Sequence, residues 1–239
     1  MKKLLIFVCA SVAILCSSSV FASDYPVEIN KRPLTLPAGT WSAGANLNAN
    51  SGFDVLSLGL TGNYAVNDQI QVNVGYGLTL KEFALGEGLS LGMNYGVIND
   101  GPLRVAPSVT FPLNFGDGDT LSVINIGADS RFNLMDDRLA LFFGHNLIGI
   151  GIGGGSSYTI QLPVGVGYQV TSQINVRLDL LLATLAEGAN LTIADVTPVT
   201  LTGVYSLNNT MDVGVQANMN AQAIGDSLAL NVMFAYRGL

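Results

Sequence analysis

The chain carries little charge for its length of 239 residues. It has 10 Lys and Arg, 17 Asp and Glu and one His, so charged residues make up 11%, against about 25% in an average soluble domain. Phosphate contacts with nucleic acid need clustered Lys and Arg, which an acidic chain with ten basic residues supplies poorly. The composition thus argues against a nucleic-acid-binding protein and is unusual for a water-soluble one.

Long apolar runs are also missing after the first 22 residues. No stretch reaches the 18 or so consecutive apolar residues that a transmembrane helix needs. Hydrophobic residues nevertheless make up 49% of the chain, with 28 glycines, and the mean hydropathy is +0.44. High hydrophobicity without a membrane-spanning helix is typical of a transmembrane β-barrel.

The N-terminus has the pattern of a secretory signal peptide over residues 1–22. Lys2 and Lys3 precede the apolar run 4–16, and the small residues Val20 and Ala22 stand at positions −3 and −1 of the expected cleavage site. An uncleaved anchor helix is the alternative, but its apolar run is short for a bilayer. We therefore expect cleavage after Ala22.

Cleavage would remove Cys9 and Cys16, which are the chain's two cysteines. The mature protein would then have no disulfide, no thiol nucleophile and no Cys-based metal site. Loss of Lys2 and Lys3 takes the formal net charge from −7 to −9.

Residues 37–239 alternate between apolar and polar side chains with a period of two. From Ile70 to Leu80, for example, every second residue is apolar and the residues between are Gln, Asn, Gly or Thr. This alternation predicts strands with one apolar and one polar face, and residues 23–36 before them have an irregular pattern. The predicted strands are 38–48, 54–64, 70–80, 88–98, 103–115, 121–134, 139–149, 158–169, 174–184, 195–206, 211–221 and 227–237.

Each predicted strand has the length that a tilted strand needs to cross a bilayer. We expect an all-β fold, a transmembrane antiparallel up-and-down β-barrel of about 12 strands, with 10–14 possible. Prolines lack a donor for the strand ladder and therefore predict bulges or displaced strand ends. They fall inside the predicted strands at Pro107, Pro112, Pro163 and Pro198.

An aromatic residue recurs at the end of every second predicted strand. These residues are Tyr64, Tyr95, Phe132, Tyr168, Tyr205 and Tyr236. Short turns rich in Asn and Asp follow most of them, as expected for tight periplasmic hairpins. All six fall on the apolar face, so they predict an aromatic girdle at one membrane interface.

A soluble β-sandwich or a lipocalin-like barrel is the alternative to a membrane barrel. Either fold would bury twelve Leu-, Val- and Ile-rich faces inside and present Gly, Asn, Ser and Gln to water. Its surface would carry very few charges, which disfavours both soluble folds.

Residues 37–239 resemble a bacterial outer-membrane β-barrel of the porin-like type. Such barrels commonly end in an alternating apolar strand with a terminal aromatic, which the barrel-assembly machinery reads. Leu228, Leu230, Val232, Phe234 and Tyr236 are similar to that signal, although Arg237-Gly238-Leu239 follow the aromatic. The resemblance implies an outer-membrane location and contact with outer-membrane lipid.

Charges on the polar faces are the candidate functional residues. On strands paired in sequence order, Arg104 is expected opposite Arg131 or Asn133, with Asp129 diagonally near. They predict either a mixed-charge ring that filters solutes or ion pairs that satisfy one another. The candidate pore-lining charges are Arg104, Asp129, Arg131, Arg177, Asp179 and Asp212, with Arg237 on the same face.

Residues 23–36 are the available candidate for a plug of the lumen. Lys31 and Arg32 could engage lumenal acids. The other inward positions are mostly small and polar, and a barrel of about twelve strands is wider than the eight-stranded kind that side chains fill. Room for water would remain.

Catalytic chemistry finds little support in the sequence. The single histidine, His145, has no serine two residues away, and Asn146 is expected on the opposite strand face, so a Ser–His arrangement with a third orienting group is not formed. Residues 149–154 match GxGxxG, but a strand rather than a helix follows. We predict no catalytic residue, no metal and no cofactor.

Three functions remain open. The first is a passive outer-membrane channel for small hydrophilic solutes, the second a non-conducting structural or surface-interaction barrel, and the third a lipid-modifying enzyme, which the isolated His145 disfavours. Short external loops argue against a large adhesive surface. The expected loops are 49–53, 81–87, 116–120, 150–157, 185–194 and 222–226.

Overall fold

The computed structural model describes residues 25–50, 52, 55–80, 88–114, 120–152, 157–188, 192–193, 198–222 and 227–238. The expected signal peptide, and all or part of each expected external loop, lie outside these residues. Across the described ranges, no helix is long and apolar enough to cross a membrane. The described elements are η1 Ile29–Lys31, β1 Trp41–Asn50, β2 Leu56–Ala65, β3 Ile70–Thr79, β4 Gly88–Tyr95, β5 Leu103–Asn114, β6 Val123–Leu134, β7 Leu139–Phe143, β8 Ile148–Gly151, β9 Ser157–Gln169, β10 Ile174–Ala186, β11 Thr192–Ile193, β12 Pro198–Ser206, β13 Met211–Asn220 and β14 Ala229–Gly238.

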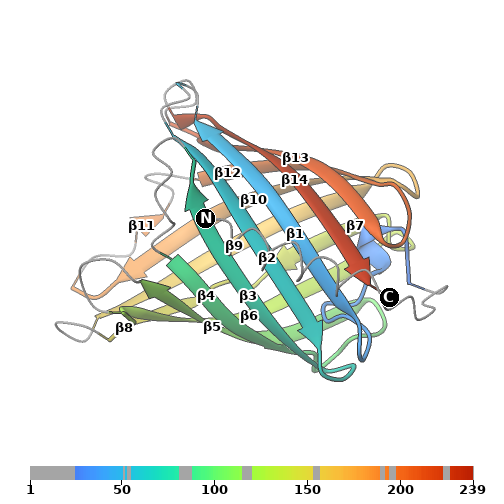
Figure 1. Ribbon diagram of the computed structural model, residues 1–239, viewed down its shortest axis with the longest axis horizontal. Helices are drawn as coiled ribbons and strands as arrows, with labels where there is room; N and C mark the ends of the chain where they lie inside the picture. The colour runs from blue at the N-terminus through green and yellow to red at the C-terminus, as the bar shows by residue number, and fades with distance from the viewer. Residues whose placement is uncertain are drawn as a thin grey trace, which may run out of the picture.

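The strands form a closed, antiparallel, twelve-stranded barrel (Figure 1), which confirms the predicted fold class. Neighbours in sequence pair along the wall, and β14 pairs with β1 from Trp41↔Gly238 to Asn50↔Ala229 to close it. The short strands β7 and β8 occupy one position in the wall, since both pair with β6 and with β9. The two-residue β11 only extends the edge of β10.

The apolar face of the barrel points outward. Val215 and Val232 are 61% and 59% exposed, and most other exposed large apolar residues lie at alternate positions of the strands. Few apolar side chains are buried, whereas four arginines and several Asn and Ser residues are. This inverted distribution excludes the soluble sandwich and lipocalin alternatives and suits a wall surrounded by lipid.

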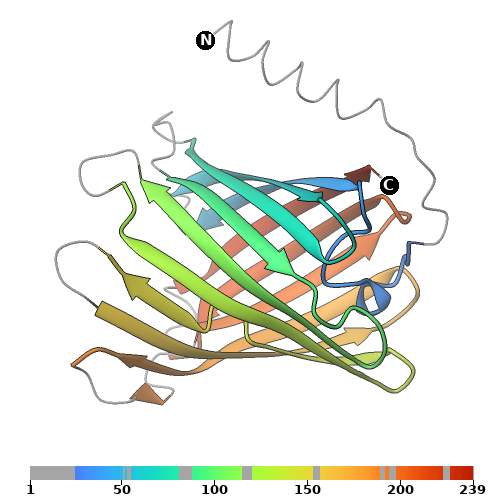
Figure 2. The same cartoon turned by 90° about the horizontal axis from the view of Figure 1, so that it is seen from below.

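Both ends of the barrel sequence lie at the same end of the barrel (Figure 2). Trp41 begins β1 beside Gly238 of β14, and residues 25–36 lie in the opening at this end. The turns 66–69, 135–138, 170–173 and 207–210 are four residues long and close hairpins here. Their brevity matches the tight turns expected at a periplasmic end.

The four prolines lie at register shifts or at a strand end, as expected. Pro163 lies beside a β-bulge, because the β9–β10 register shifts between Leu181 and Ala183, and Pro198 begins β12. The ladder is also irregular beside Pro107 and Pro112 on β5. After Asn94↔Ser108, pairing with β4 resumes at Ile98↔Val105, and after Thr110↔Asn125, pairing with β6 resumes at Leu113↔Leu121. Each register shifts by one residue, as at a β-bulge, where a residue without a donor is tolerated.

The single strand predicted over 139–149 is wrong, because a break at Gly144–Leu147 separates β7 from β8. Gly144 has φ 92° and Asn146 has φ 48°, both in the left-handed region. A Cβ on Gly144 would meet the carbonyl oxygen of Ala128 at 2.1 Å. The break therefore depends on glycine at this close approach.

We expect Val215→Arg to destabilise the refolded barrel by about 2–4 kcal/mol, because it places a charge at mid-strand on the lipid face. Val170→Arg is the matched control. Val170 is 50% exposed and lies just past the end of β9, where the cost is about 0–1 kcal/mol. Urea unfolding in lipid vesicles measures both, and equal losses would contradict an outward membrane face.

Candidate functional site

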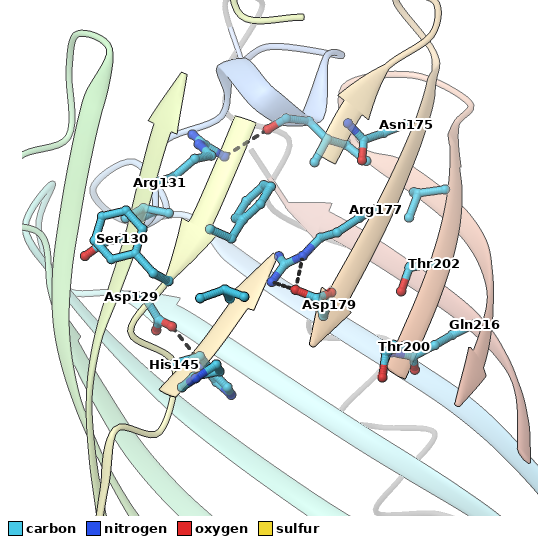
Figure 3. A pocket seen from close by; sticks show the side chains of 17 residues that line it. Asp129, Ser130, Arg131, His145, Asn175, Arg177, Asp179, Thr200, Thr202 and Gln216 are labelled. Carbon is cyan, nitrogen blue, oxygen red and sulfur yellow. Dashed lines mark hydrogen bonds and ion pairs between the residues drawn. The ribbon is translucent and has the colours of Figure 1, made fainter. Parts of the chain in front are cut away.

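A cavity of about 610 Å³ lies inside the barrel. Its walls come from β6, β7, the β7–β8 break, β9, β10, β12 and β13 (Figure 3), and Ile29 and Leu34 of the N-terminal region line one side. Thr200, Thr202 and Gln216 give part of the wall neutral hydrogen-bonding groups. The cavity is polar and roomy enough for water and small solutes.

Arg177 and Asp179 form an ion pair in the cavity wall. Arg177 donates from Nε and Nη2 to Asp179 Oδ1 over 2.8 and 2.6 Å. Its guanidinium carbon also lies 3.9 Å from the centroid of the Phe142 ring, close enough for a cation–π contact. Gly167 makes room for that ring, since a Cβ there would lie 2.8 Å from Phe142.

Phe142 is a lumenal residue that the sequence analysis missed. Leu139, Leu141 and Phe143 form the apolar alternation, so Phe142 falls on the polar face. An aromatic residue on that face was the available signal for an inward-pointing ring.

Asp129 pairs with His145 rather than with an arginine. The carboxylate lies 2.9 Å from His145 Nδ1, and Asn146 Nδ2 lies 3.3 Å from Nε2. The expectation that Asn146 lies on the opposite face from His145 is therefore wrong. The break in the strand changes the alternation, so the two side chains come into contact. Ser130, which also lines the cavity, donates its hydroxyl to the Ala128 carbonyl.

Arg104 and Arg131 lie directly opposite each other in the β5–β6 register. Neither pairs with a carboxylate in the described hydrogen bonds. Instead both donate to the N-terminal segment, which we define as residues 25–36. Arg104 Nη1 bonds the carbonyl of Asn30 over 3.2 Å and that of Arg32 over 2.6 Å. Arg131 bonds the carbonyls of Ile29, over 3.1 Å, and of Arg32.

Asp212 joins the N-terminal segment to the wall through two arginines. It accepts from Arg32 Nη1 and Nη2 over 2.7 and 3.0 Å, and also from Arg237. All three side chains are at least 90% buried. Lys31, by contrast, pairs with Glu28 and stays exposed, so only one of the two basic residues expected to engage lumenal acids does so.

Tyr25 packs against both arginines. Its ring centroid is 5.7 Å from the Arg32 guanidinium and 5.6 Å from that of Arg237, and it clusters with Leu36 and Ala65. Burial raises the pKa of the Tyr25 hydroxyl, although the nearby cations oppose the shift. The hydroxyl therefore stays neutral at ordinary pH.

Asn30 of the N-terminal segment bonds the wall through both its side chain and its backbone, and it has no exposed surface. Its side-chain amide donates to the carbonyls of Asp137 and Arg138 over 3.0 and 3.2 Å. Asn175 donates to its Oδ1 over 3.1 Å, and Asn133 donates to its backbone carbonyl over 2.7 Å. This one residue thus connects the segment to β6, β10 and the β6–β7 turn.

The six aromatics of the predicted girdle lie near the ends of β2, β4, β6, β9, β12 and β14. Tyr64, Tyr95 and Phe132 are 49%, 42% and 37% exposed, and Tyr168 and Tyr205 are exposed to a similar degree. Tyr236 is half-buried against Trp41, with ring centroids 5.5 Å apart. The sequence analysis missed Trp41. The girdle itself stays a prediction.

In the described ranges, no group of three or more His, Cys, Asp or Glu residues comes together to hold a metal ion.

Solved structures with a similar fold are outer-membrane porins. A KdgM porin aligns with TM-score 0.59 and 11% identity over 82% of this chain and 98% of its own. A KdgM porin in complex with disordered oligogalacturonate gives the same values. A NanC porin aligns with TM-score 0.59 and 8% identity over 81% and 97% of the two chains. In sequence, no family model and no curated protein matches this chain.

The chain thus has the porin-like barrel fold expected from its sequence. At such low identity the likeness concerns the fold alone, so the function is argued from this chain's own lumen.

We expect Asp212→Asn to destabilise the barrel by about 3–5 kcal/mol, because it leaves Arg32 and Arg237 buried without their counter-charge. Asp179→Asn is the control, since its side chain is 30% exposed and such a pair is worth at most about 1 kcal/mol. Urea unfolding of both refolded variants measures the difference. Equal small losses would show that the buried arginine pair does not depend on Asp212.

Proposed function

We propose that this protein is a passive outer-membrane channel for small hydrophilic solutes that favours anions. The observation that carries the proposal is the arginine-rich lumen of a closed, polar-lined barrel. In the described part of the chain, the lumenal charges are Arg32, Arg104, Arg131, Arg177 and Arg237 against Asp129, Asp179 and Asp212.

This excess of positive charge runs against the composition of the whole protein. The chain has more acidic than basic residues, yet five of its six arginines lie inside while many acids, such as Asp68, Asp100 and Asp136, lie in turns. A low-dielectric wall focuses the field of such charges into the lumen. Anions are therefore the solutes that the lumen concentrates.

Acidic saccharides are the solute class that we favour. They carry carboxylates for arginines and hydroxyls for neutral groups such as Thr200, Thr202 and Gln216, all of which line the cavity. The KdgM porin, whose fold is similar, has been solved with an oligogalacturonate. That complex supports the choice of class by analogy of fold.

The proposed location is the bacterial outer membrane. It follows from the outward apolar face together with export by a signal peptide over residues 1–22 that is cleaved after Ala22. The apolar alternation of β14 would serve recognition by the barrel-assembly machinery. The six aromatics at the strand ends would form the interfacial girdle.

A non-conducting barrel is the second candidate, and a specific observation favours it: the N-terminal segment occupies one end of the lumen. A lipid-modifying enzyme is less well supported. His145 contacts Asp129 and Asn146, and the nearby Ser130 hydroxyl is directed to a backbone carbonyl, whereas a nucleophile must reach its base.

The channel is tested by conductance of the refolded chain 23–239 in a planar bilayer. The wild type is compared with the anchor-free variant Asn30→Ala/Arg32→Ser, which lacks the main side-chain anchors of the N-terminal segment. Stable current steps in either protein support a channel. Silence from both, with folding shown by heat-dependent gel migration, overturns it and favours the structural barrel.

We expect ion selectivity to follow the Arg177–Asp179 pair in the anchor-free background. A unit charge about 6 Å from an ion in water is worth about 0.7 kcal/mol, or about threefold in local ion concentration. Arg177→Gln should lower the anion preference by about that factor and Asp179→Asn should raise it. Reversal potentials in a KCl gradient measure both.

The double variant Arg177→Gln/Asp179→Asn is the control, because it removes both charges and should return selectivity close to the starting value. Unchanged reversal potentials in all three variants would place the ion path elsewhere.

We also expect an acidic trisaccharide, trigalacturonate, to block the current while neutral maltotriose at the same concentration does not. The two sugars are similar in size, so the difference reports the carboxylates. Block should weaken as salt rises, because salt screens the attraction. Equal block by both sugars would contradict the anion preference.

A further inference from the structure

The N-terminal segment fills the end of the lumen where the short hairpin turns lie (Figure 2). Asn30, Thr35, Leu36 and Tyr25 are all more than 90% buried although they belong to no strand. We propose that residues 25–36 are a releasable plug, which closes the channel while seated and must leave its seat for solute to pass. This inference rests on the proposed channel function.

The seat of the plug consists of side chains from several parts of the wall. Arg104, Arg131 and Asn133 on β5 and β6 donate to plug carbonyls. Gln71 on β3 accepts from the backbone N–H of Leu36 over 3.0 Å. Asn175 on β10 and Asp212 on β13 also bond the plug. Because β13 lies across the closed barrel from β5, the plug spans the opening.

No strand ladder holds the plug. The described backbone–backbone hydrogen bonds of residues 25–36 run within the segment itself, from Lys31 N to the Glu28 carbonyl and from Arg32 N to the Ile29 carbonyl. Every described hydrogen bond between the plug and the wall involves a side chain, either of the plug or of the wall. The plug can therefore leave without breaking a hydrogen bond of the barrel sheet.

The buried wall carboxylate Asp212 keeps a partner after release. Asp212 is bonded by Arg32 from the plug and by Arg237 from β14. When Arg32 leaves, Asp212 remains paired with Arg237. An unpaired buried carboxylate, which would oppose release strongly, does not arise.

The tether of the plug is fixed at residues 39–40. Gly39 donates to the Ala65 carbonyl over 2.9 Å, and Ala65 donates to the Thr40 carbonyl over 2.9 Å. Gly39 has φ 74° and open space around its Cβ position. The chain thus turns from the barrel wall into the lumen at a glycine that accommodates the left-handed conformation.

Release is tested by single-channel recording of the full mature chain. Asn30→Ala/Arg32→Ser removes two buried anchors, whose loss should raise the open fraction at least tenfold, since a hydrogen bond to a charged group is worth about that factor. Lys31→Ser is the matched control. Lys31 lies between the two anchors but is exposed and bonds only Glu28 in the described structure, so the open fraction should not change.

A second experiment holds the plug in its seat. Asn30→Cys/Asn175→Cys places thiols where the two amides are 3.1 Å apart, in a mature chain that has no other cysteine. Bridging the thiols with a short, reducible bifunctional reagent should abolish the current, and reduction should restore it. Each single-cysteine variant treated with the same reagent controls for simple modification of the lumen.

The outcomes separate the two proposals. If the wild type and the anchor-free variant conduct equally and bridging has no effect, the plug is overturned and the channel stands. If neither conducts although both fold, the channel itself is overturned. A closed wild type, an open anchor-free variant and loss of current on bridging support the plug.

Discussion

The need to pair every backbone polar group within the wall determines the rest of this structure. Lipid offers no partner to an unpaired N–H or C=O group, so a sheet that faces lipid must close on itself. Here closure is made by the ten residue pairs between β1 and β14. Once the sheet is closed, alternation leaves one face for lipid and one for the lumen. Burial of polar residues and exposure of apolar ones then follow.

Much of the fold could be predicted from the sequence because a strand's two faces meet two different environments. The period-two pattern located β3, predicted at 70–80 and observed as Ile70–Thr79, and β9, predicted at 158–169 and observed as Ser157–Gln169. Neighbouring strands pair in sequence order, so the Arg104–Arg131 register could also be predicted. The break at Gly144 could not, because it depends on how closely β6 approaches.

The contacts of the lumen were predictable only in part. Arg177 and Asp179 lie two residues apart on one strand, so their proximity is local and was expected. Asp212 and Arg32 are separated by 180 positions, and their pairing depends on where the N-terminal segment folds back into the barrel. Alternation carries no information about that path. The stacking of Arg177 on Phe142 likewise depends on the space left by Gly167 on β9.

The β1–β14 seam also orders events in folding. Trp41 and Gly238 are among the most distant described residues in the chain, yet they pair, and a Cβ on Gly238 would collide with the Trp41 ring. Contacts between such distant residues carry a large loop-closure entropy and form late. The seat of the N-terminal segment takes Gln71 from β3 on one side of the seam and Asp212 from β13 on the other, so the full seat is complete only when the seam is made. The lone tryptophan lies at that seam, which makes its fluorescence an intrinsic reporter of the moment when the cylinder closes.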